Sequence, residues 1–404
     1  MTPEQPSIPF SYYRGGTSKA LFFHDKDVPP SGHARNKLFI RLMGSPDPMQ
    51  IDGMGGTYIV TSKIAVVKPS SRQDADVDYT FYQISVEADE ISDDHNCGNI
   101  SSAVGPFAIT EGLIKEFRAG QRIDPKVKTQ EIRIFNTGTK KVLVAHIPLK
   151  EDGRVQESGT FEIAGCPGTG APILMDYKDT LGASRGKGML PTGNPIDMVE
   201  VSGQNIEFTF CDVANPVIFA QATALGIQGD KPPRALDENS TLLVKVKELR
   251  GKVAQKLGMC QHWERVDEES GAMPMVALVS EASDPHGHIQ SRVFIDNKTH
   301  TSMAGTGAIC HTACSRAPGT VVNKLKRAGC EKEKMFNIQH PLGIMPVTVS
   351  TRPGEGGQLP RFQTLSFIRT ARRFLKGEID VPDDVTDIFL EGMQQAHRST
   401  TNGV

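Results

Sequence analysis

The chain has 404 residues and a formal net charge of −2, with 38% hydrophobic and 23% charged residues. This length is typical of two domains or one large one, and the composition predicts a sizeable core rather than disorder. The near-neutral charge does not favour nucleic acid or a membrane surface as a partner. No segment approaches the roughly 18 consecutive apolar residues that a transmembrane helix requires. The polar start MTPEQPSIPF does not resemble a leader, so we expect a cytoplasmic protein.

The cysteines form an odd and scattered set that does not suggest a disulfide framework. We expect most of them to be reduced and buried, with Cys97 as the exception. The seven positions are Cys97, Cys166, Cys211, Cys260, Cys310, Cys314 and Cys330.

In chain order, residues 7–23 (SIPFSYYRGGTSKALFF) predict a strand, a Gly-Gly turn and a second strand. Alternation with a period of two predicts another strand over residues 57–67, which puts Lys63 on the same face as Ile59. The run DYTFYQISVEA predicts the next strand.

The segment HNCGNISSAVGPFAITEGLI combines small and apolar residues at helical spacing. It predicts a buried helix that begins near Cys97, with Asn96 as its cap. Residues 131–147 then predict a hairpin.

A weaker version of this order recurs after residue 200. IEFTFCDVANPVIFAQA predicts strand, Asn-Pro turn and strand, and SRVFIDNKTHTSMAGTGAICHTACSR predicts a strand that leads into a Gly-rich helix start. The two halves therefore indicate a pseudo-repeat, each a sheet wrapped on a buried helix. The Gly- and Pro-rich region 153–195 is the expected connection. After Asp380 we expect a short polar helix at most.

Two residues suggest acid–base chemistry. Backbone N–H groups at a helix start bind anions and lower the pKa of a neighbouring thiol, so Cys97 could exchange protons, although a small buried apolar role stays open. Lys63 is either an edge or surface lysine, or a desolvated base with a depressed pKa. Ser18 and the Gly53–Gly56 stretch could donate hydrogen bonds from loops, and Ala304–Gly307 offers a second helix start for an anion.

Other polar patterns favour plain structural interpretations. Cys310, His311 and Cys314 have near-metal spacing, but no second Cys/His pair supports a zinc site. His340 could be a carboxylate ligand or a satisfied loop histidine. Turn or solvated surface positions are expected for His286 with His288, for Gly168–Gly170, and for Arg369 with Arg372 and Arg373.

The motifs YRGGTSK, GSPDP with IDGMGG, the Ser62-Lys63 pair, and NCGN with AVGPFAI closely resemble the 2-methylaconitate cis-trans isomerase family. Relatives in that family include 3-methylitaconate isomerase, oxalomesaconate tautomerase and aconitate-Δ-isomerase. The resemblance covers nearly the whole chain, including PTGN at 191–194, the AGTGA stretch, HPLG at 340–343 and FIRTARRFLKGEI.

The resemblance implies an α/β fold with two pseudo-symmetric domains like those of diaminopimelate epimerase. Each would be a curled, mainly antiparallel sheet around a central helix, with the active site in the cleft between them. The expected domains are 1–188, completed by 365–404, and 189–364. The epimerases carry a catalytic Cys at both helix starts, whereas this chain has Ala304 at the second, which disfavours a two-thiol racemase.

By the same resemblance, the chain is an isomerase with no cofactor and no metal that shifts an allylic proton on an unsaturated tricarboxylate. We expect conversion of cis-aconitate to trans-aconitate. The alternatives are 2-methylaconitate, oxalomesaconate or methylitaconate as substrate and, from another class, a non-catalytic accessory protein of an aconitase-type dehydratase. A small-molecule substrate is the expected partner, and a homodimer stays open.

The resemblance assigns catalysis to Lys63 and Cys97, with Ser18 beside them, and does not decide which of the first two is the base. The remaining residues expected to contact substrate are Arg14, Gly15, Gly16, Thr17, Ser62, Asn96, Gly98, Asn99, Thr192, Gly193, Asn194, Ala304, Gly305, Thr306, Gly307 and His340.

Overall fold

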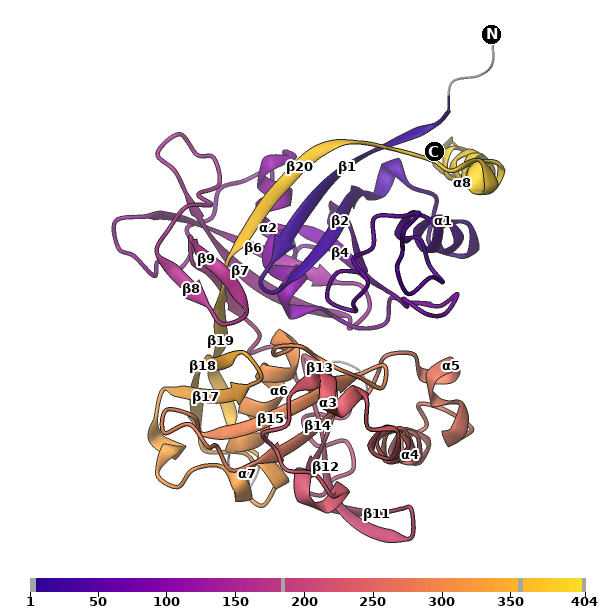
Figure 1. Cartoon of the computed structure of the whole chain (residues 1–404). Helices are drawn as coiled ribbons and strands as arrows, with labels where there is room; N and C mark the ends of the chain where they lie inside the picture. Colours follow the sequence, from indigo (N-terminus) through magenta and orange to yellow (C-terminus); the bar gives the residue numbers. More distant parts are fainter. Residues whose placement is uncertain (1–4, 183–185, 355–358, 402–404) are drawn as a thin grey trace.

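The computed structural model describes residues 5–182, 186–354 and 359–401. Two lobes lie one above the other, and the chain ends near its beginning in the upper lobe (Figure 1). No helix in these described ranges has both the length and the apolar character needed to cross a bilayer.

The upper lobe is a curled sheet around one buried helix, with two further helices outside it. Its strands are β1 (Ser7–Gly15), β2 (Ser18–His24), β3 (Lys63–Pro69), β4 (Val77–Ile84), β5 (Ile91–Ser92), β6 (Lys128–Asn136), β7 (Lys141–Leu149), β10 (Ile173–Asp176) and β20 (Ala371–Asp380), with the separate hairpin β8 (Phe161–Ile163) and β9 (Cys166–Gly170). Its helices are α1 (His33–Met43), α2 (Gly98–Thr110) and α8 (Asp383–Thr401).

The lower lobe repeats this plan around the helix α6 (Gly305–Arg316). Its strands are β11 (Asp197–Val201), β12 (Gln204–Val213), β13 (Asn215–Gln221), β14 (Met275–Ser280), β15 (Ile289–Ile295), β16 (Lys298–Thr299), β17 (Met335–His340), β18 (Gly343–Arg352) and β19 (Arg361–Arg369). Its other helices are α3 (Pro233–Asp237), α4 (Ser240–Lys256), α5 (Val266–Ser270) and α7 (Val321–Leu325).

The order and direction of the strand pairs confirm the predicted pseudo-repeat. In the upper lobe β1–β2 is antiparallel, β2–β3 parallel, β3–β4 antiparallel, β4–β6 parallel and β6–β7 antiparallel. The lower lobe has the same sequence of pairings in β12–β13, β13–β14, β14–β15, β15–β17 and β17–β18. Each central helix comes after the fourth strand of this repeated series, which is β4 in the upper lobe and β15 in the lower lobe. The two halves therefore share one topology.

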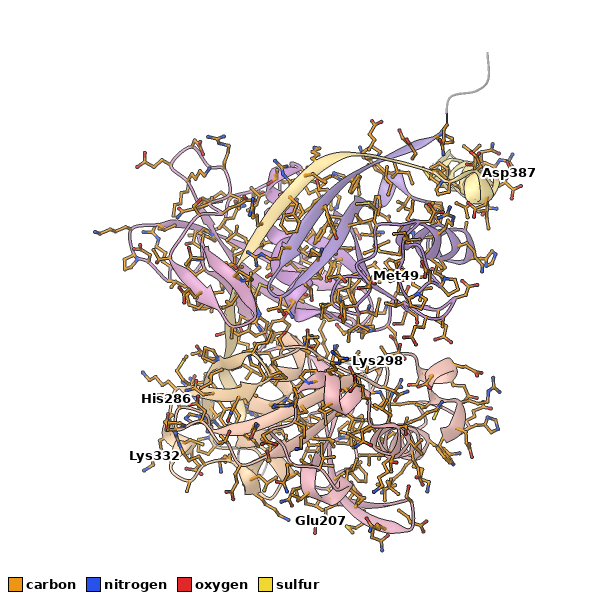
Figure 2. The ribbon with its side chains drawn as sticks, viewed as in Figure 1. Met49, Glu207, His286, Lys298, Lys332 and Asp387 are labelled. Carbon is orange, nitrogen blue, oxygen red and sulfur yellow. The ribbon has the colours of Figure 1, made fainter. Side chains whose placement is uncertain are left out.

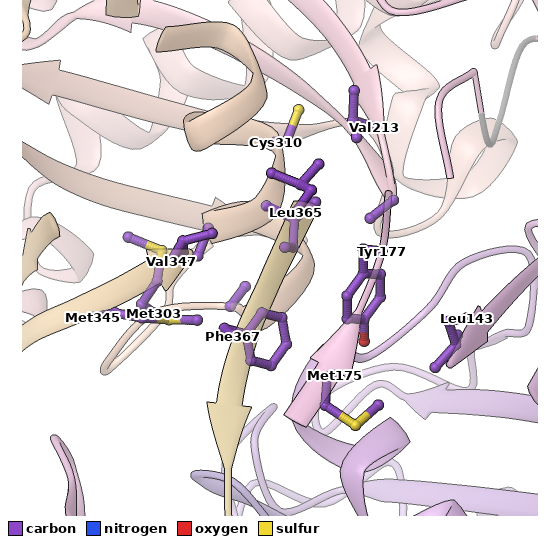
Figure 3. Packing of buried hydrophobic residues seen from close by; sticks show 14 of the residues in the cluster. Leu143, Met175, Tyr177, Val213, Met303, Cys310, Met345, Val347, Leu365 and Phe367 are labelled. Carbon is purple, nitrogen blue, oxygen red and sulfur yellow. The ribbon is translucent and has the colours of Figure 1, made fainter. Parts of the chain in front are cut away.

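The strand β19 joins the two lobes into one continuous sheet, because it pairs with β18 of the lower lobe and with β10 of the upper lobe. Its residue Phe367 stacks on Tyr177, which follows β10, with ring centroids 5.3 Å apart. Figure 3 shows these rings side by side next to Met175, where the strand passes between the lobes. The core cluster that contains them includes buried residues of both lobes, so the largest core is shared between the lobes.

The central helix α2 is buried along nearly its whole length, as the small and apolar residues of its sequence predict. Its N-cap is Cys97 rather than Asn96. The Asn96 side chain instead accepts a hydrogen bond of 2.7 Å from the hydroxyl of Ser101, so it does not cap the helix. The helix start was thus predicted one residue too early.

The strand predicted over residues 57–67 begins only at Lys63. Thr57 has a positive φ of 66°, which breaks an extended run. The buried Gln50 side chain accepts hydrogen bonds from the Thr57 amide and the Ser62 hydroxyl, each at 2.8 Å. These contacts hold the segment before Lys63 as a loop, so Lys63 and Ile59 do not share a strand face.

The C-terminal helix is longer than the short polar helix expected after Asp380. α8 spans 19 residues and packs on α1. Its residues Val385 and Phe389 are buried in the same cluster as Phe39 of α1, while Leu390 is 42% exposed. This helix therefore completes a second core of the upper lobe, outside the sheet.

We expect Phe389→Ala to lower the free energy of unfolding by about 3 kcal/mol, the usual effect of removing a buried phenyl ring. Leu390→Ala, one position along the same helix, should change it by less than about 0.5 kcal/mol because that side chain faces solvent. Urea unfolding of both variants measures the difference. Equal effects would show that α8 does not contribute to the core as described.

Candidate active site

Cys97 lies at the start of the upper central helix, as the sequence predicts. Its backbone carbonyl accepts hydrogen bonds from the amide and the hydroxyl of Ser101, at 2.8 and 2.9 Å. Its side chain is partly exposed, whereas Cys211, Cys310 and Cys314 are buried. Cys97 therefore combines solvent access with a position at the positive end of a helix dipole, which attracts anions.

The starts of the two central helices touch each other between the lobes. A Cβ atom placed on Gly98 would lie 2.7 Å from the backbone nitrogen of Thr306, and one on Gly305 would lie 3.1 Å from the carbonyl carbon of Gly98. Only glycine permits this approach. Ala304, the N-cap of α6, takes the position that corresponds to Cys97.

Asn215 bonds both helix starts together. Its side chain accepts a hydrogen bond from the Asn96 amide at 3.1 Å and donates to the Asn96 carbonyl at 2.7 Å. It also donates to the Thr306 hydroxyl at 3.0 Å. Sequence analysis assigned Asn215 to a simple Asn-Pro turn and missed this role, because the turn carries no sign of the distant partners.

Lys63 is buried at the first position of β3, with 5% of its surface exposed. Its ammonium group donates to Gln83 Oε1 and lies 5.0 Å from the centre of the Phe81 ring. Burial lowers the pKa of Lys63, and the neighbouring Cys97 partly opposes this by favouring the charged form. The two predicted acid–base residues are therefore electrostatic neighbours, although they come from different elements.

Gln83 on β4 is an unpredicted part of this arrangement. Its amide nitrogen donates to the carbonyls of Ile59 and Ser62, at 3.1 and 3.0 Å. Those bonds orient its oxygen toward Lys63. The Gln83 side chain is neutral, so it holds the lysine without adding a counter-charge that would raise its pKa.

The predicted Gly-Gly hairpin lies against the start of α2. A Cβ on Gly15 would approach the Asn99 carbonyl to 2.5 Å, and one on Gly16, where φ is +52°, would meet the Asn99 side chain at 2.2 Å. The Asn99 amide donates to Thr17 Oγ1 at 3.2 Å. Arg14 fixes the turn by donating to the carbonyls of Gly16 and Thr370, each at 2.9 Å.

Ser18, which begins β2, has a buried hydroxyl with no hydrogen-bond partner. An unsatisfied buried hydroxyl costs roughly 1–3 kcal/mol, so such groups are often found at functional sites.

Beside this hairpin, a small cavity of about 50 Å³ lies between β8, the Thr17 turn and the lower lobe. Thr17 and Ser302 close it across the lobes through a hydroxyl contact of 3.0 Å. Arg369 and His340 also line it. Lys63 and Cys97 are not on its wall, but Asn99, two residues after Cys97, contacts both Thr17 and Arg369.

Two buried histidines belong to this region. Burial, together with Lys63, lowers the pKa of His300 to about 3, and burial with Arg369 lowers that of His340 to about 4. The Nδ1 atom of His300 accepts from the Ser302 amide at 3.1 Å, and that of His340 accepts from the Leu342 amide at 3.3 Å. Both rings are therefore neutral at pH 7, with the proton on Nε2.

The structure does not bring every predicted residue to this region. Thr192, Gly193 and Asn194 form a turn whose side chains bond within it and to Asp197 at 3.1 Å. Ser62 is bonded to Gln50. Gly307 bonds through its carbonyl to His311 Nδ1 at 2.7 Å, one turn along α6.

Arg369 and His288 correct two expectations of solvated side chains. Arg369 is only 6% exposed, because β19 is covered by both lobes. The alternation of Leu365, Phe367 and Arg369 could have indicated that the arginine shares a buried face. His288 is also buried and accepts from the Asn337 amide at 3.1 Å.

The other polar residues that the sequence analysis discussed make ordinary structural contacts. His311 bonds to Ser291 at 2.8 Å, and the Cys310 thiol donates to the Cys211 carbonyl at 3.2 Å. Gly168–Gly170 lies in β9 rather than in a free turn. Across the part of the chain that the structure describes, no three His, Cys, Asp or Glu side chains are grouped to hold a metal ion.

Comparisons with known proteins agree with this architecture. The chain is 37% identical over 390 residues to 3-methylitaconate isomerase of Eubacterium barkeri. The alignment covers 94% of this chain and 98% of the relative. It is 33% identical to 4-oxalomesaconate tautomerase of Pseudomonas putida and 34% identical to 2-methyl-aconitate isomerase of Shewanella oneidensis, each over 94% of this chain and 98% of the relative.

Solved structures show the same fold. A crystal structure of methylitaconate-delta-isomerase superposes with a TM-score of 0.72 at 36% identity, over 95% of this chain and 97% of that chain. A hydroxyproline epimerase from Agrobacterium vitis superposes with a TM-score of 0.56 at 12% identity, over 98% and 100% of the two chains. The second likeness concerns the fold alone.

The two-lobed fold with facing central helices, together with these relatives, defines the protein as an isomerase with the fold of the racemases and epimerases. The family model described as PrpF protein matches residues 5–382. The chain belongs to the PrpF protein family.

The lowered pKa of His300 predicts a pH-dependent loss of stability. Folding keeps this ring neutral, while the unfolded chain takes up a proton below its ordinary pKa of 6.5. Because the unfolded state binds more protons, stability falls as the pH decreases from about 6.5 toward 3. His300→Gln should therefore show a shallower loss of unfolding free energy over this range than the wild type.

The exposed His286 offers a matched control, because it lies at the surface of the lower lobe (Figure 2). His286→Gln should follow the wild-type slope in urea unfolding measured at several pH values. A wild-type slope in His300→Gln would show that His300 is not kept neutral by the fold.

Proposed function

We propose that this isomerase shifts an allylic proton on an unsaturated tricarboxylate, and that it converts cis-aconitate to trans-aconitate. The observation that carries the proposal is the pair of Lys63 and Cys97. A buried lysine with a lowered pKa interacts electrostatically with a partly exposed thiol at a helix start. A neutral lysine can remove a carbon-bound proton at moderate pH, which an ordinary surface lysine cannot do.

In aconitate, a methylene group lies next to the double bond and a carboxylate. Loss of a methylene proton gives an allylic, dienolate-like anion, and protonation at the far carbon moves the double bond by one position. The product is again aconitate, now of the other geometry. One of Lys63 and Cys97 removes the first proton and the other delivers the second. The two groups have then exchanged protonation states, and proton exchange with water restores the starting state.

The developing negative charge needs stabilisation, because the carbon acid is very weak. The amides at the start of α2, directly beside Cys97, supply fixed dipoles for this purpose. Asn99, Thr17 and the unpartnered hydroxyl of Ser18 add side-chain donors. These donors would stabilise the allylic anion while Lys63 and Cys97 transfer the protons.

A second candidate substrate is 2-methylaconitate. Apolar side chains of Ile163, Met303 and Met345 line the same cavity as Arg369, and they would accept a methyl group. A methyl group changes binding by only about 1–3 kcal/mol, so both substrates fit the same machinery. The ratio of kcat/KM for aconitate and 2-methylaconitate, measured side by side, decides between them.

We expect Lys63→Ala and Cys97→Ala each to lower turnover of the preferred substrate at least about 100-fold, the usual scale for a positioned acid or base. Two controls match them. Lys68→Ala removes an exposed lysine from the same strand, and Cys166→Ala removes the other partly exposed thiol. Both controls should keep nearly full activity. A folded Cys97→Ala enzyme with wild-type turnover would remove the thiol from the mechanism.

The source of the transferred hydrogen is a separate test. A protonated lysine carries three equivalent hydrogens, so an abstracted proton is diluted before any return, and a second residue delivers a hydrogen that has exchanged with water. Turnover of cis-aconitate in heavy water should therefore place about one deuterium on the new methylene carbon of trans-aconitate. Proton NMR or mass spectrometry measures this incorporation.

Transient addition of the Cys97 thiolate to the double bond would give the same product without carbon–hydrogen exchange. Product without deuterium, formed with no primary isotope effect from methylene-deuterated substrate, would support that addition route and contradict the proton shift. A primary isotope effect without incorporation would instead indicate a shielded transfer by a single base.

A further inference from the structure

Arg369 is the last residue of β19, the strand shared by both lobes. It follows Leu365 and Phe367 on the buried face, and 6% of its surface is exposed. A side chain of this kind is normally at the surface or paired with a carboxylate, so its burial between the lobes requires an explanation.

No hydrogen-bond partner of the Arg369 guanidinium is a carboxylate. Nε donates to Asn99 Oδ1 at 2.8 Å, Nη1 donates to the Ile368 carbonyl at 3.0 Å, and Nη2 contacts the Met345 sulfur at 2.6 Å. Within residues 5–182, 186–354 and 359–401, no carboxylate lies within ion-pair distance of it. Burial lowers its pKa to about 10, which still leaves the group charged at pH 7.

An isolated buried charge is expensive, and a thioether is a weak substitute for a carboxylate oxygen. The fork of an arginine also has two parallel N–H directions that match a carboxylate. The described part of the chain therefore holds a preformed cation with no carboxylate paired to it.

The cavity beside Arg369 provides access for such an anion. Thr17, Ser302 and His340 line it together with the guanidinium, and His340 has its Nδ1 occupied, which leaves a proton on Nε2. Glu162 is the acidic side chain on this wall, and it is exposed on β8 and makes no ion pair with Arg369. The charged side chains that line the cavity are thus Arg369, which is buried, and Glu162, which is exposed.

Asn99 connects the wall of this cavity to the helix that begins at Cys97. Its side chain bonds to Arg369 and to Thr17, and its backbone lies two residues after Cys97 on the same helix. A substrate with several carboxylates could hold one of them on the guanidinium while its methylene carbon lies near Lys63 and Cys97.

We propose that Arg369 is the anchor of a carboxylate subsite in this cavity, where it binds one carboxylate of the substrate with Thr17 and His340 beside it. The identity of the substrate as a tricarboxylate rests on the proposed function, whereas the presence of an anion subsite rests on the uncompensated guanidinium. Arg369 acts here as a binding residue and not as an acid or base.

Propane-1,2,3-tricarboxylate tests the subsite, because it has the carboxylates of aconitate but no double bond to move. We expect Arg369→Gln to weaken its binding at least about tenfold in calorimetry, the scale of one charged hydrogen-bond pair. Arg372→Gln removes the same charge from an exposed position three residues later and should bind within about twofold of the wild type.

Circular dichroism and the melting temperature establish that each variant is folded. If Arg369→Gln does not fold, Arg369→Lys keeps the charge but loses the fork, and we expect binding at least about threefold weaker. Wild-type affinity in a folded Arg369→Gln protein, or in Arg369→Lys if the first variant is unfolded, would overturn the proposal. Failure of the wild type to bind the tricarboxylate would overturn it as well.

The binding measurement separates this proposal from the proposed reaction. If the wild type binds propane-1,2,3-tricarboxylate through Arg369 but does not convert aconitate, the subsite stands and the proposed reaction fails. If it converts aconitate while Arg369→Gln binds and turns over normally, the reaction stands and the subsite fails.

Discussion

The close contact between the starts of the two central helices is the constraint on which the rest of the site depends. Gly98 and Gly305 bring the two backbones so near that an added Cβ would collide, and Asn215 bonds the Asn96 backbone and the Thr306 hydroxyl across the same boundary. The strand β19 then ties the sheets of both lobes together. With the lobes fixed in this way, residues far apart in the chain, such as Thr17 and Ser302, meet at one cavity.

The electrostatics of this region are unusual, because positive and neutral basic groups are buried there without a carboxylate partner among the described residues. Lys63 is held by the neutral Gln83, and Arg369 by an amide, a carbonyl and a thioether. His300 and His340 are kept uncharged by burial and by these cations. Each buried cation reduces stability by itself, and an anion bound beside it would offset that cost. The proposed binding of a polyanionic substrate accounts for this pattern.

The two lobes share one topology but not one chemistry. Cys97 at the first helix start corresponds to Ala304 at the second, and Lys63 at the start of β3 corresponds to Met275 at the start of β14. The two residues proposed for acid–base catalysis thus come from the upper lobe, while the lower lobe supplies His300, Ser302 and His340. A symmetric fold with an asymmetric site suits a reaction that removes a proton from one carbon and returns it to another.

Local patterns in the sequence determined the hairpins, the two buried helices, their repeat and the position of Cys97 at a helix start, since turn residues and apolar periodicity act over a few neighbouring residues. The motifs also identified the family. The tertiary structure alone decided that β3 begins at Lys63, because the Gln50 side chain bonds the preceding loop. It alone decided that α8 packs on α1, and that Asn215 joins the helix starts. Arg369 shows the limit most clearly. Its segment resembles a charged surface, and only the pairing of β19 with strands of both lobes buries it. That burial depends on contacts between residues far apart in the chain, which no local pattern records.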